Sequence, residues 1–92
     1  MTDREKLYKK IIRQSEKIIA DCRQAIRDYE WWNKNNPQHP PLDIEPERVL
    51  LSKEIRVLSL FRAGDSKGSA RLAGENVAYM QRVFSEGEQI DA

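Results

Sequence analysis

The first 36 residues contain neither proline nor glycine, and this feature constrains the fold more than any other. Small and apolar side chains recur within this stretch at alternating intervals of four and three residues, at Ile11, Ser15, Ile18, Cys22, Ala25, Tyr29 and Trp32. Such a period is typical of an α-helix with one broad apolar face. Thr2 and Glu5 stand at the spacing of a capping box. The sequence therefore predicts a helix over about residues 2–32, roughly 45 Å long.

Asparagines and prolines follow this helix and predict a stiff linker over residues 33–44. Trp31 and Trp32 point about 100° apart on a helix, so both cannot face one core. Trp32 continues the apolar stripe. Trp31 is expected to pack against Pro40 and Pro41 or to contact a partner. His39 is interpreted as a solvated loop residue.

Two shorter helices are predicted after the linker. The first covers about residues 45–63, with Pro46 in its first turn and Gly64 as its stop. It holds too many apolar residues for one stripe, which predicts a central helix covered on more than one side. The second covers about residues 66–85, and residues 86–92 are interpreted as an acidic, frayed tail. The apolar positions of this last helix are Ala70, Ala73, Val77, Met80 and Phe84. Gly74 within it suggests a close helix crossing or a local break.

The predicted fold is a single all-α domain of three helices, in which a long N-terminal helix precedes a shorter helical hairpin. Its 92 residues, 39% of them hydrophobic and 34% charged, suit one soluble domain. The long first helix would leave apolar residues uncovered, and uncovered apolar surface usually marks an interface. A homo-oligomer, most simply a two-fold dimer, is therefore expected. The expected interface residues are Leu7, Tyr8, Ile11, Ile18 and Trp31.

Composition argues against catalysis and against a cofactor. Cys22 and His39 are the only residues of their types, so neither a disulfide nor a Cys/His metal site is expected. Cys22 falls on the apolar stripe and is interpreted as a small buried hydrophobe. The sequence holds no HExxH, no GxSxG and no phosphate-binding P-loop motif. With no apolar run of membrane-spanning length and no secretory signal, a cytoplasmic protein without enzymatic activity is expected.

The stretch RAGDSKGSARLAG, residues 62–74, combines three glycines with serines and cations at the junction of the second and third helices. A helix N-terminus offers free N–H groups and a positive dipole end, which favour a phosphate or a carboxylate. The expected anion-binding residues are Arg62, Ser66, Lys67, Ser69 and Arg71. A plain interhelical turn with solvated charges explains the same residues and stays open as the alternative.

A helix-turn-helix over residues 66–84 is the other functional hypothesis. Ala70 and Gly74, followed by Met80 and Val83, have the small, turn and apolar positions of that motif. Glu75 departs from it, because the turn normally buries an apolar residue there. The expected DNA-contacting residues are Asn76, Tyr79, Gln81 and Arg82.

Charge does not favour nucleic acid as the main partner. Residues 48–82 carry seven cations against three acids, a local balance of +4, while the whole chain is at +1. This falls short of the basic face of a committed nucleic-acid binder. The sequence therefore favours a small regulatory protein that binds itself and an unidentified protein partner, of the kind found as bacterial or phage accessory factors. A nucleic acid or a nucleotide is a less favoured partner, and no membrane is expected.

Overall fold

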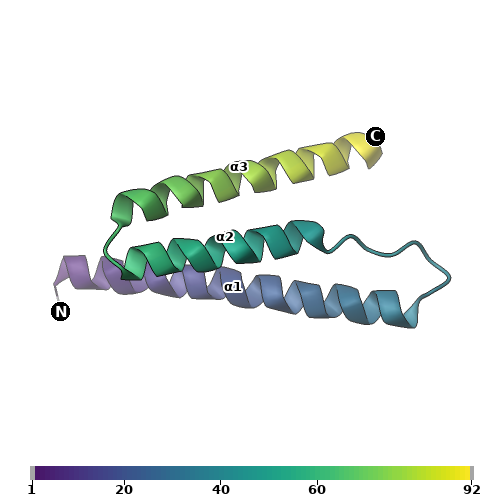
Figure 1. Cartoon of the computed structure of the whole chain (residues 1–92), viewed down its shortest axis with the longest axis horizontal. Coiled ribbons are helices and arrows are strands. Elements are labelled where there is room, and N and C mark those ends of the chain that lie inside the picture. Colours follow the sequence, from purple (N-terminus) through teal and green to yellow (C-terminus); the bar gives the residue numbers. More distant parts are fainter. Residues whose placement is uncertain (1, 92) are drawn as a thin grey trace.

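The computed structural model describes the backbone of residues 2–91 and the side chains of residues 2–83. It contains three helices, α1 (Asp3–Asn35), α2 (Glu45–Arg62) and α3 (Ser66–Asp91), and the described backbone has no strand (Figure 1). The predicted all-α fold is confirmed, and the starts of the helices lie within a residue of those predicted.

Helix α1 is capped at both ends by side chains of its own neighbourhood. The Thr2 hydroxyl accepts a hydrogen bond from the Glu5 N–H at 3.2 Å, as the capping box predicts. At the other end, the Asn35 and Asn36 amides donate to the carbonyls of Trp31 (2.7 Å) and Trp32 (2.9 Å). Carbonyls of a last helical turn lack partners within the helix. These two amides add side-chain hydrogen bonds to the end of the helix, and α1 extends three residues beyond the prediction.

The linker folds back onto the end of α1 through Asn33. Its side chain donates to the Leu42 carbonyl at 3.0 Å and accepts from the Leu42 N–H at 2.7 Å. The Trp32 ring lies over the His39 ring, with centroids 5.5 Å apart. Trp31 is 64% exposed, so the expected packing of Trp31 on the prolines is wrong. Trp32 meets the linker instead, since its side of α1 faces the returning chain.

The connection between α2 and α3 is held by backbone hydrogen bonds at the end of α2 and by a side-chain cap at the start of α3. Gly64 adopts a φ of 89°, and the Gly64 and Asp65 N–H groups donate to the carbonyls of Phe61 (3.1 Å) and Leu60 (2.9 Å). This pattern is a Schellman motif, which needs a residue with positive φ after the helix. The Asp65 carboxylate then accepts from the Gly68 N–H at 2.9 Å and caps α3. Gly64 as the stop of α2 is as predicted.

Helix α3 is longer than predicted and is not interrupted by its glycines. It runs through Gly74 and Gly87 to Asp91. A methyl group built on Gly74 would meet nothing within 4 Å, so Gly74 marks neither a helix crossing nor a break. One glycine costs about 1 kcal/mol in a helix, which neighbouring glutamates and glutamine can offset. The acidic side chains expected in the tail lie outside the described side chains.

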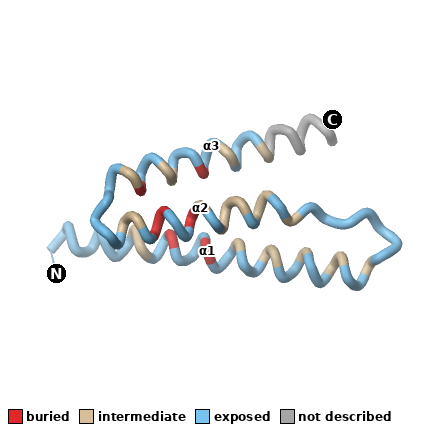
Figure 2. Tube along the Cα trace, in the orientation of Figure 1, coloured by how far each residue is buried: buried red, intermediate tan, exposed pale blue. Residues whose placement is uncertain are grey.

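Helix α2 lies in the centre, and α1 and α3 each pack against it in an antiparallel sense (Figure 1). No α-carbon of α1 lies within 8 Å of one in α3 across the described residues. Figure 2 shows that burial is confined to the stretch where the three helices run together. Among residues 2–83, the buried apolar side chains are Ile19, Val57 and Leu58. The shared core is therefore very thin.

Candidate functional site

An open groove of about 700 Å³ separates α1 from α3, and α2 forms its floor. It exists because both outer helices pack on α2 without reaching each other. Its lining is mainly apolar: Ile11, Ile18 and Cys22 on the α1 wall, Ala70, Ala73, Val77 and Met80 on the α3 wall, and Leu50, Val57 and Phe61 on the floor.

The walls of this groove leave large apolar side chains in contact with solvent. Ile18 is 42% exposed, Val77 53% and Met80 38%. Apolar residues scattered singly over a surface are ordinary, whereas a contiguous lining that faces a hollow marks an interaction site. The groove is therefore the strongest candidate for a binding site on this chain.

A polar cluster lies at the base of the groove, with one side chain from each helix. The Ser15 hydroxyl donates to Glu54 Oε1 at 2.5 Å, and Asn76 Nδ2 donates to Glu54 Oε2 at 3.2 Å. All three residues are at most 6% exposed. The remaining amide oxygen of Asn76, Oδ1, is buried without a hydrogen-bond partner. The groove thus has apolar walls and one unsatisfied acceptor at its centre, so it suits an occupant that carries a hydrogen-bond donor between apolar side chains.

Cys22 lines the same groove but is unsuited to nucleophilic chemistry. Burial raises the pKa of the Cys22 thiol, and the charges of Glu47, Glu54 and Asp21 raise it further. A thiol with a raised pKa stays protonated at neutral pH, and the thiolate is the reactive form. Within the described residues, no three His, Cys, Asp or Glu side chains are grouped so that they could hold a metal ion.

The structure does not bring the five predicted anion-binding residues together. The Asp65 carboxylate occupies the N-terminus of α3, where an anion was expected. Ser69 is buried and donates to the Val57 carbonyl at 2.9 Å, and the Arg62 guanidinium pairs with Glu16 at 2.9 Å. Ser66, Lys67 and Arg71 remain exposed. A site built from all five residues is therefore not formed, because the chain's own groups occupy it.

The geometry of α3 also differs from a helix-turn-helix. That motif needs a turn near Gly74, whereas α3 is continuous there and runs antiparallel to α2. Asn76 is 4% exposed and donates a hydrogen bond to Glu54, so the prediction that Asn76 contacts DNA is wrong. Tyr79 lies between two cations, 5.1 Å from Lys53 Nζ and 5.4 Å from Arg82 Cζ. Gln81 is exposed beside them. DNA contact by Tyr79, Gln81 and Arg82 stays a prediction.

The five predicted interface residues lie in three places. Ile11 and Ile18 line the groove. Tyr8 stacks on Phe61 near the end of α2, with ring centroids 5.0 Å apart. Tyr8 is still 43% exposed, and its neighbour Leu7 is 58% exposed. Trp31 lies at the far end of α1 and is not part of the groove lining.

Glu54 and the α3 wall were not predicted as site residues, and Asn76 was predicted to contact DNA rather than to line a groove. The Ala70, Ala73, Val77 and Met80 period was visible in the sequence, but it predicted a buried face. A stripe in the sequence gives the apolar face of a helix and does not say whether a neighbour covers it. For Asn76, a polar residue between apolar positions of a helix was the available signal.

Comparison with protein-family models, curated proteins and solved structures gives no match to this chain. Across the described residues, no helix combines the length and apolar character needed to cross a membrane.

Proposed function

We propose that this protein is a non-enzymatic helical interaction protein that works as a homodimer, in which a helix of the second copy fills the groove between α1 and α3. The observation that carries the proposal is the open apolar groove itself. An amphipathic helix laid in an apolar groove is a common mode of protein recognition.

The accessible area of the chain favours a second copy as the occupant. A folded monomer of 10.8 kDa is expected to expose about 5,500 Å², whereas this chain exposes 7224 Å². The excess is roughly 1,700 Å² per chain, within the range that one subunit buries in an obligate homodimer. A symmetric dimer gives every copy the missing cover at once.

The first half of α1 has the pattern that the groove requires. Gln14 stands on the groove side of α1 between Ile11 and Ile18, and all three line the groove. Seen from a second copy, this face offers an amide donor between two apolar anchors. In the proposed dimer, the two α1 helices pack antiparallel about a two-fold axis. Asn76 Oδ1 is buried in the single chain, so in the proposed dimer the Asn76 amide turns toward the groove and accepts from Gln14 of the other copy, which sets the register.

The same proposal extends from the dimer to the wider role of the protein. A closed dimer would present its outer helix surfaces to another macromolecule in the cytoplasm, in keeping with a small regulatory factor. Affinity capture with the wild-type chain, with a groove variant as the reference, would identify a partner that needs the dimer.

A matched pair of substitutions tests the proposed dimer. Ile18 and Ile55 are both 42% exposed, but only Ile18 lines the groove. Ile18→Asp would place an unpaired charge in the interface and should raise the dimer dissociation constant about tenfold or more. Ile55→Asp should leave it unchanged. Sedimentation velocity measures both, and circular dichroism checks folding. Equal effects of the two substitutions, or a wild-type protein that stays at 10.8 kDa at 100 µM, would overturn the proposal.

A further inference from the structure

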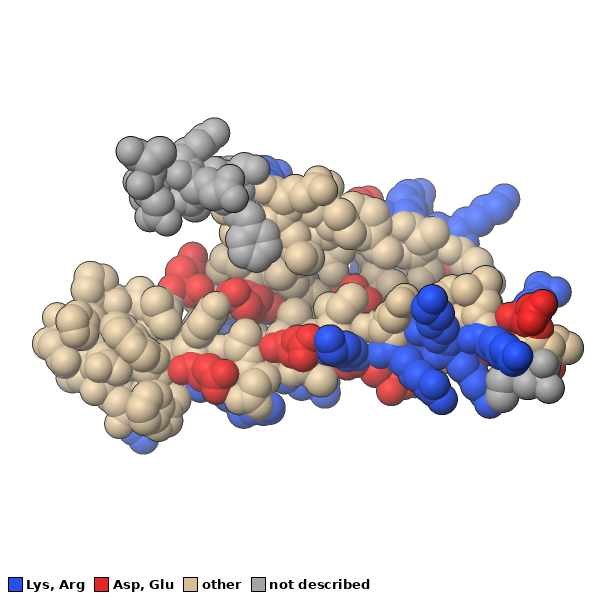
Figure 3. Space-filling model, turned by 180° about the vertical axis from the view of Figure 1, so that it is seen from behind, with Lys and Arg blue, Asp and Glu red and all other residues tan. Residues whose placement is uncertain are grey.

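The first half of α1 carries a second surface of opposite character, which we call the basic stripe. Lys6, Lys9, Lys10, Arg13 and Lys17 line a shallow hollow of about 440 Å³ together with Gln14. All five cations are exposed. Figure 3 shows Lys and Arg side chains gathered over this end of the molecule. The whole-chain balance of +1 hides this gathering, because acids elsewhere offset it.

The charges of the basic stripe are barely neutralised by the chain itself. In the part of the chain with described side chains, the ion pairs between helices use Arg48 with Glu30 and Arg62 with Glu16. Within the stripe, Lys17 approaches Asp21 at 4.0 Å, with both side chains at least 70% exposed. Such a pair contributes little. The stripe therefore offers a concentrated positive potential to a partner.

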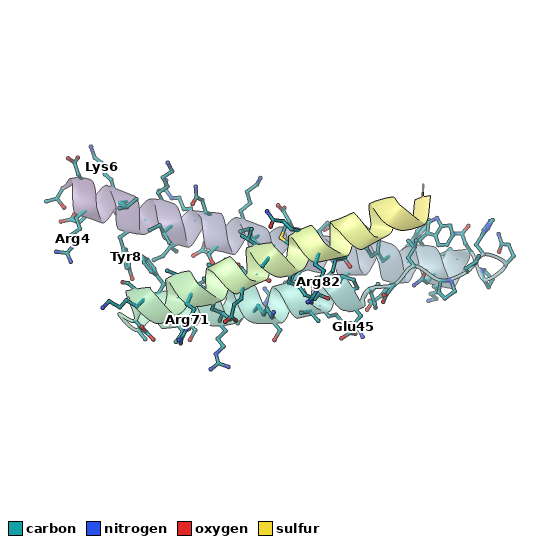
Figure 4. All side chains as sticks on the ribbon, turned by 90° about the horizontal axis from the view of Figure 1, so that it is seen from above. Arg4, Lys6, Tyr8, Glu45, Arg71 and Arg82 are labelled. Carbon is teal, nitrogen blue, oxygen red and sulfur yellow. The ribbon has the colours of Figure 1, made fainter. Side chains whose placement is uncertain are left out.

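The basic stripe faces away from the other two helices. Ser15 and Ile19 are the α1 residues buried against the bundle, and the helical period places Lys6 and Lys17 on the opposite side. Figure 4 shows Lys6 pointing away from α2 and α3. Most of the stripe thus lies outside the groove, and Gln14, which lines both surfaces, marks their common border.

We propose that the basic stripe binds the phosphate backbone of a nucleic-acid duplex without reading its sequence. Lys6 and Lys17 lie about 16 Å apart along the helix axis. A duplex carries one phosphate charge per about 1.7 Å of its axis when both strands are counted. The five exposed cations of the stripe are complementary to that density of negative charge.

A membrane surface fits this stripe less well. A helix that lies in a bilayer interface inserts an apolar face beside its cations. Near the stripe, Ile19 of α1 is buried against the bundle and Ile18 lines the α1 wall of the groove. Leu7 and Tyr8 are the large apolar side chains of this half of α1 that lie exposed outside the groove. Insertion would have to pull α1 out of the bundle, whereas phosphate contacts need no rearrangement.

The test is fluorescence anisotropy with a labelled 24-base-pair DNA duplex of random sequence at 50–200 mM NaCl. The stripe variant carries Lys10→Glu with Arg13→Glu. The matched control carries Lys34→Glu with Arg56→Glu, which makes the same change in net charge at exposed positions outside the stripe. Circular dichroism and sedimentation of both variants establish that fold and mass are kept. Anionic vesicles of phosphatidylserine and phosphatidylcholine serve as the competing surface.

The wild type should bind the duplex with an affinity that falls steeply with salt, with a log–log slope of about −3.6 to −4.5 for four to five contacts. The stripe variant should bind at least about tenfold more weakly, with a slope shallower by about 2. The control should stay within about threefold of the wild type. No binding at 50 mM NaCl, equal losses in both variants, or tight binding to the vesicles without binding to the duplex would each overturn the proposal.

Discussion

Two regions differ in how far the chain pairs its polar groups and buries its apolar side chains: the turn between α2 and α3, and the groove between α1 and α3. In the turn, Gly64 and Asp65 close the end of α2, the Asp65 carboxylate caps α3, and the Ser69 hydroxyl reaches the Val57 carbonyl. In the groove, large apolar side chains face solvent and Asn76 Oδ1 has no partner. The turn is complete within one chain, whereas the groove is not.

This difference shows where a binding site is to be sought. The turn has the residue types of an anion site, but Asp65 already accepts from the Gly68 and Ser69 N–H groups at the start of α3. The groove has no recognisable motif, yet burial of its walls would still lower the free energy of the molecule. The substitutions below test both sides of this contrast at one fixed protein concentration, because the stability of a dimer depends on concentration.

The largest effect is expected at the polar centre of the groove. Glu54→Leu removes the acceptor of both Ser15 and Asn76 and leaves two buried donors unpaired. The free energy of unfolding should fall by about 2–4 kcal/mol. Glu75→Leu, at an exposed position of α3, should change it by less than about 0.5 kcal/mol. Urea denaturation measures both. A Glu54→Leu protein as stable as the wild type would show that the polar cluster does not hold the helices together.

The reactivity of Cys22 reports on the groove without any substitution. Because burial and nearby carboxylates raise the pKa of this thiol, folding favours its protonated form. That preference is present at neutral pH and is lost as the pH rises through the folded-state pKa. Alkylation by iodoacetamide at pH 7.5 should be at least about tenfold slower than in urea. It should slow further as protein concentration rises and the groove fills. A rate that is independent of concentration between 1 and 100 µM would argue against a second copy in the groove.

Two glycines should respond in opposite directions. Gly64 has a φ of 89°, so Gly64→Ala should cost about 1–2 kcal/mol. Gly74 has helical geometry and open space around it, so Gly74→Ala should stabilise the protein by about 0.5–1 kcal/mol. Thermal denaturation compares the pair. If Gly74→Ala lowers the midpoint, another surface packs closely on this part of α3.

The smallest effect is expected for the charges of the turn. Lys67 and Arg71 are exposed and take part in none of the ion pairs formed by the described side chains. Lys67→Ala with Arg71→Ala should change the free energy of unfolding by less than about 0.5 kcal/mol and leave the dimer intact. Isothermal titration with phosphate should give no heat above dilution for either protein. Phosphate binding that the wild type shows and the double variant lacks would support the anion-site hypothesis.

Local signals predicted most of the fold. Thr2, Pro46 and Gly64 act through their own turns, so the helix starts and the α2–α3 junction could be derived without knowing what packs where. The groove could not, because its existence depends on the distance between α1 and α3, which no short segment encodes. Asn76 was assigned to a solvent face because its burial depends on Glu54 from another helix. The basic stripe was missed because charge was counted by segment, whereas the partner meets a helix face.

The most direct test of the central claim, that a second copy closes the groove, is an isotope-filtered nuclear Overhauser experiment. Protein labelled with carbon-13 is mixed with an equal amount of unlabelled protein, so that only contacts between copies are detected. The proposed dimer predicts cross-peaks from the Ile11 and Ile18 methyl groups of one copy to the Val77 and Met80 methyl groups of the other. A mixed sample with no such cross-peaks at 0.5 mM, or with cross-peaks between copies that avoid the groove, would contradict the account.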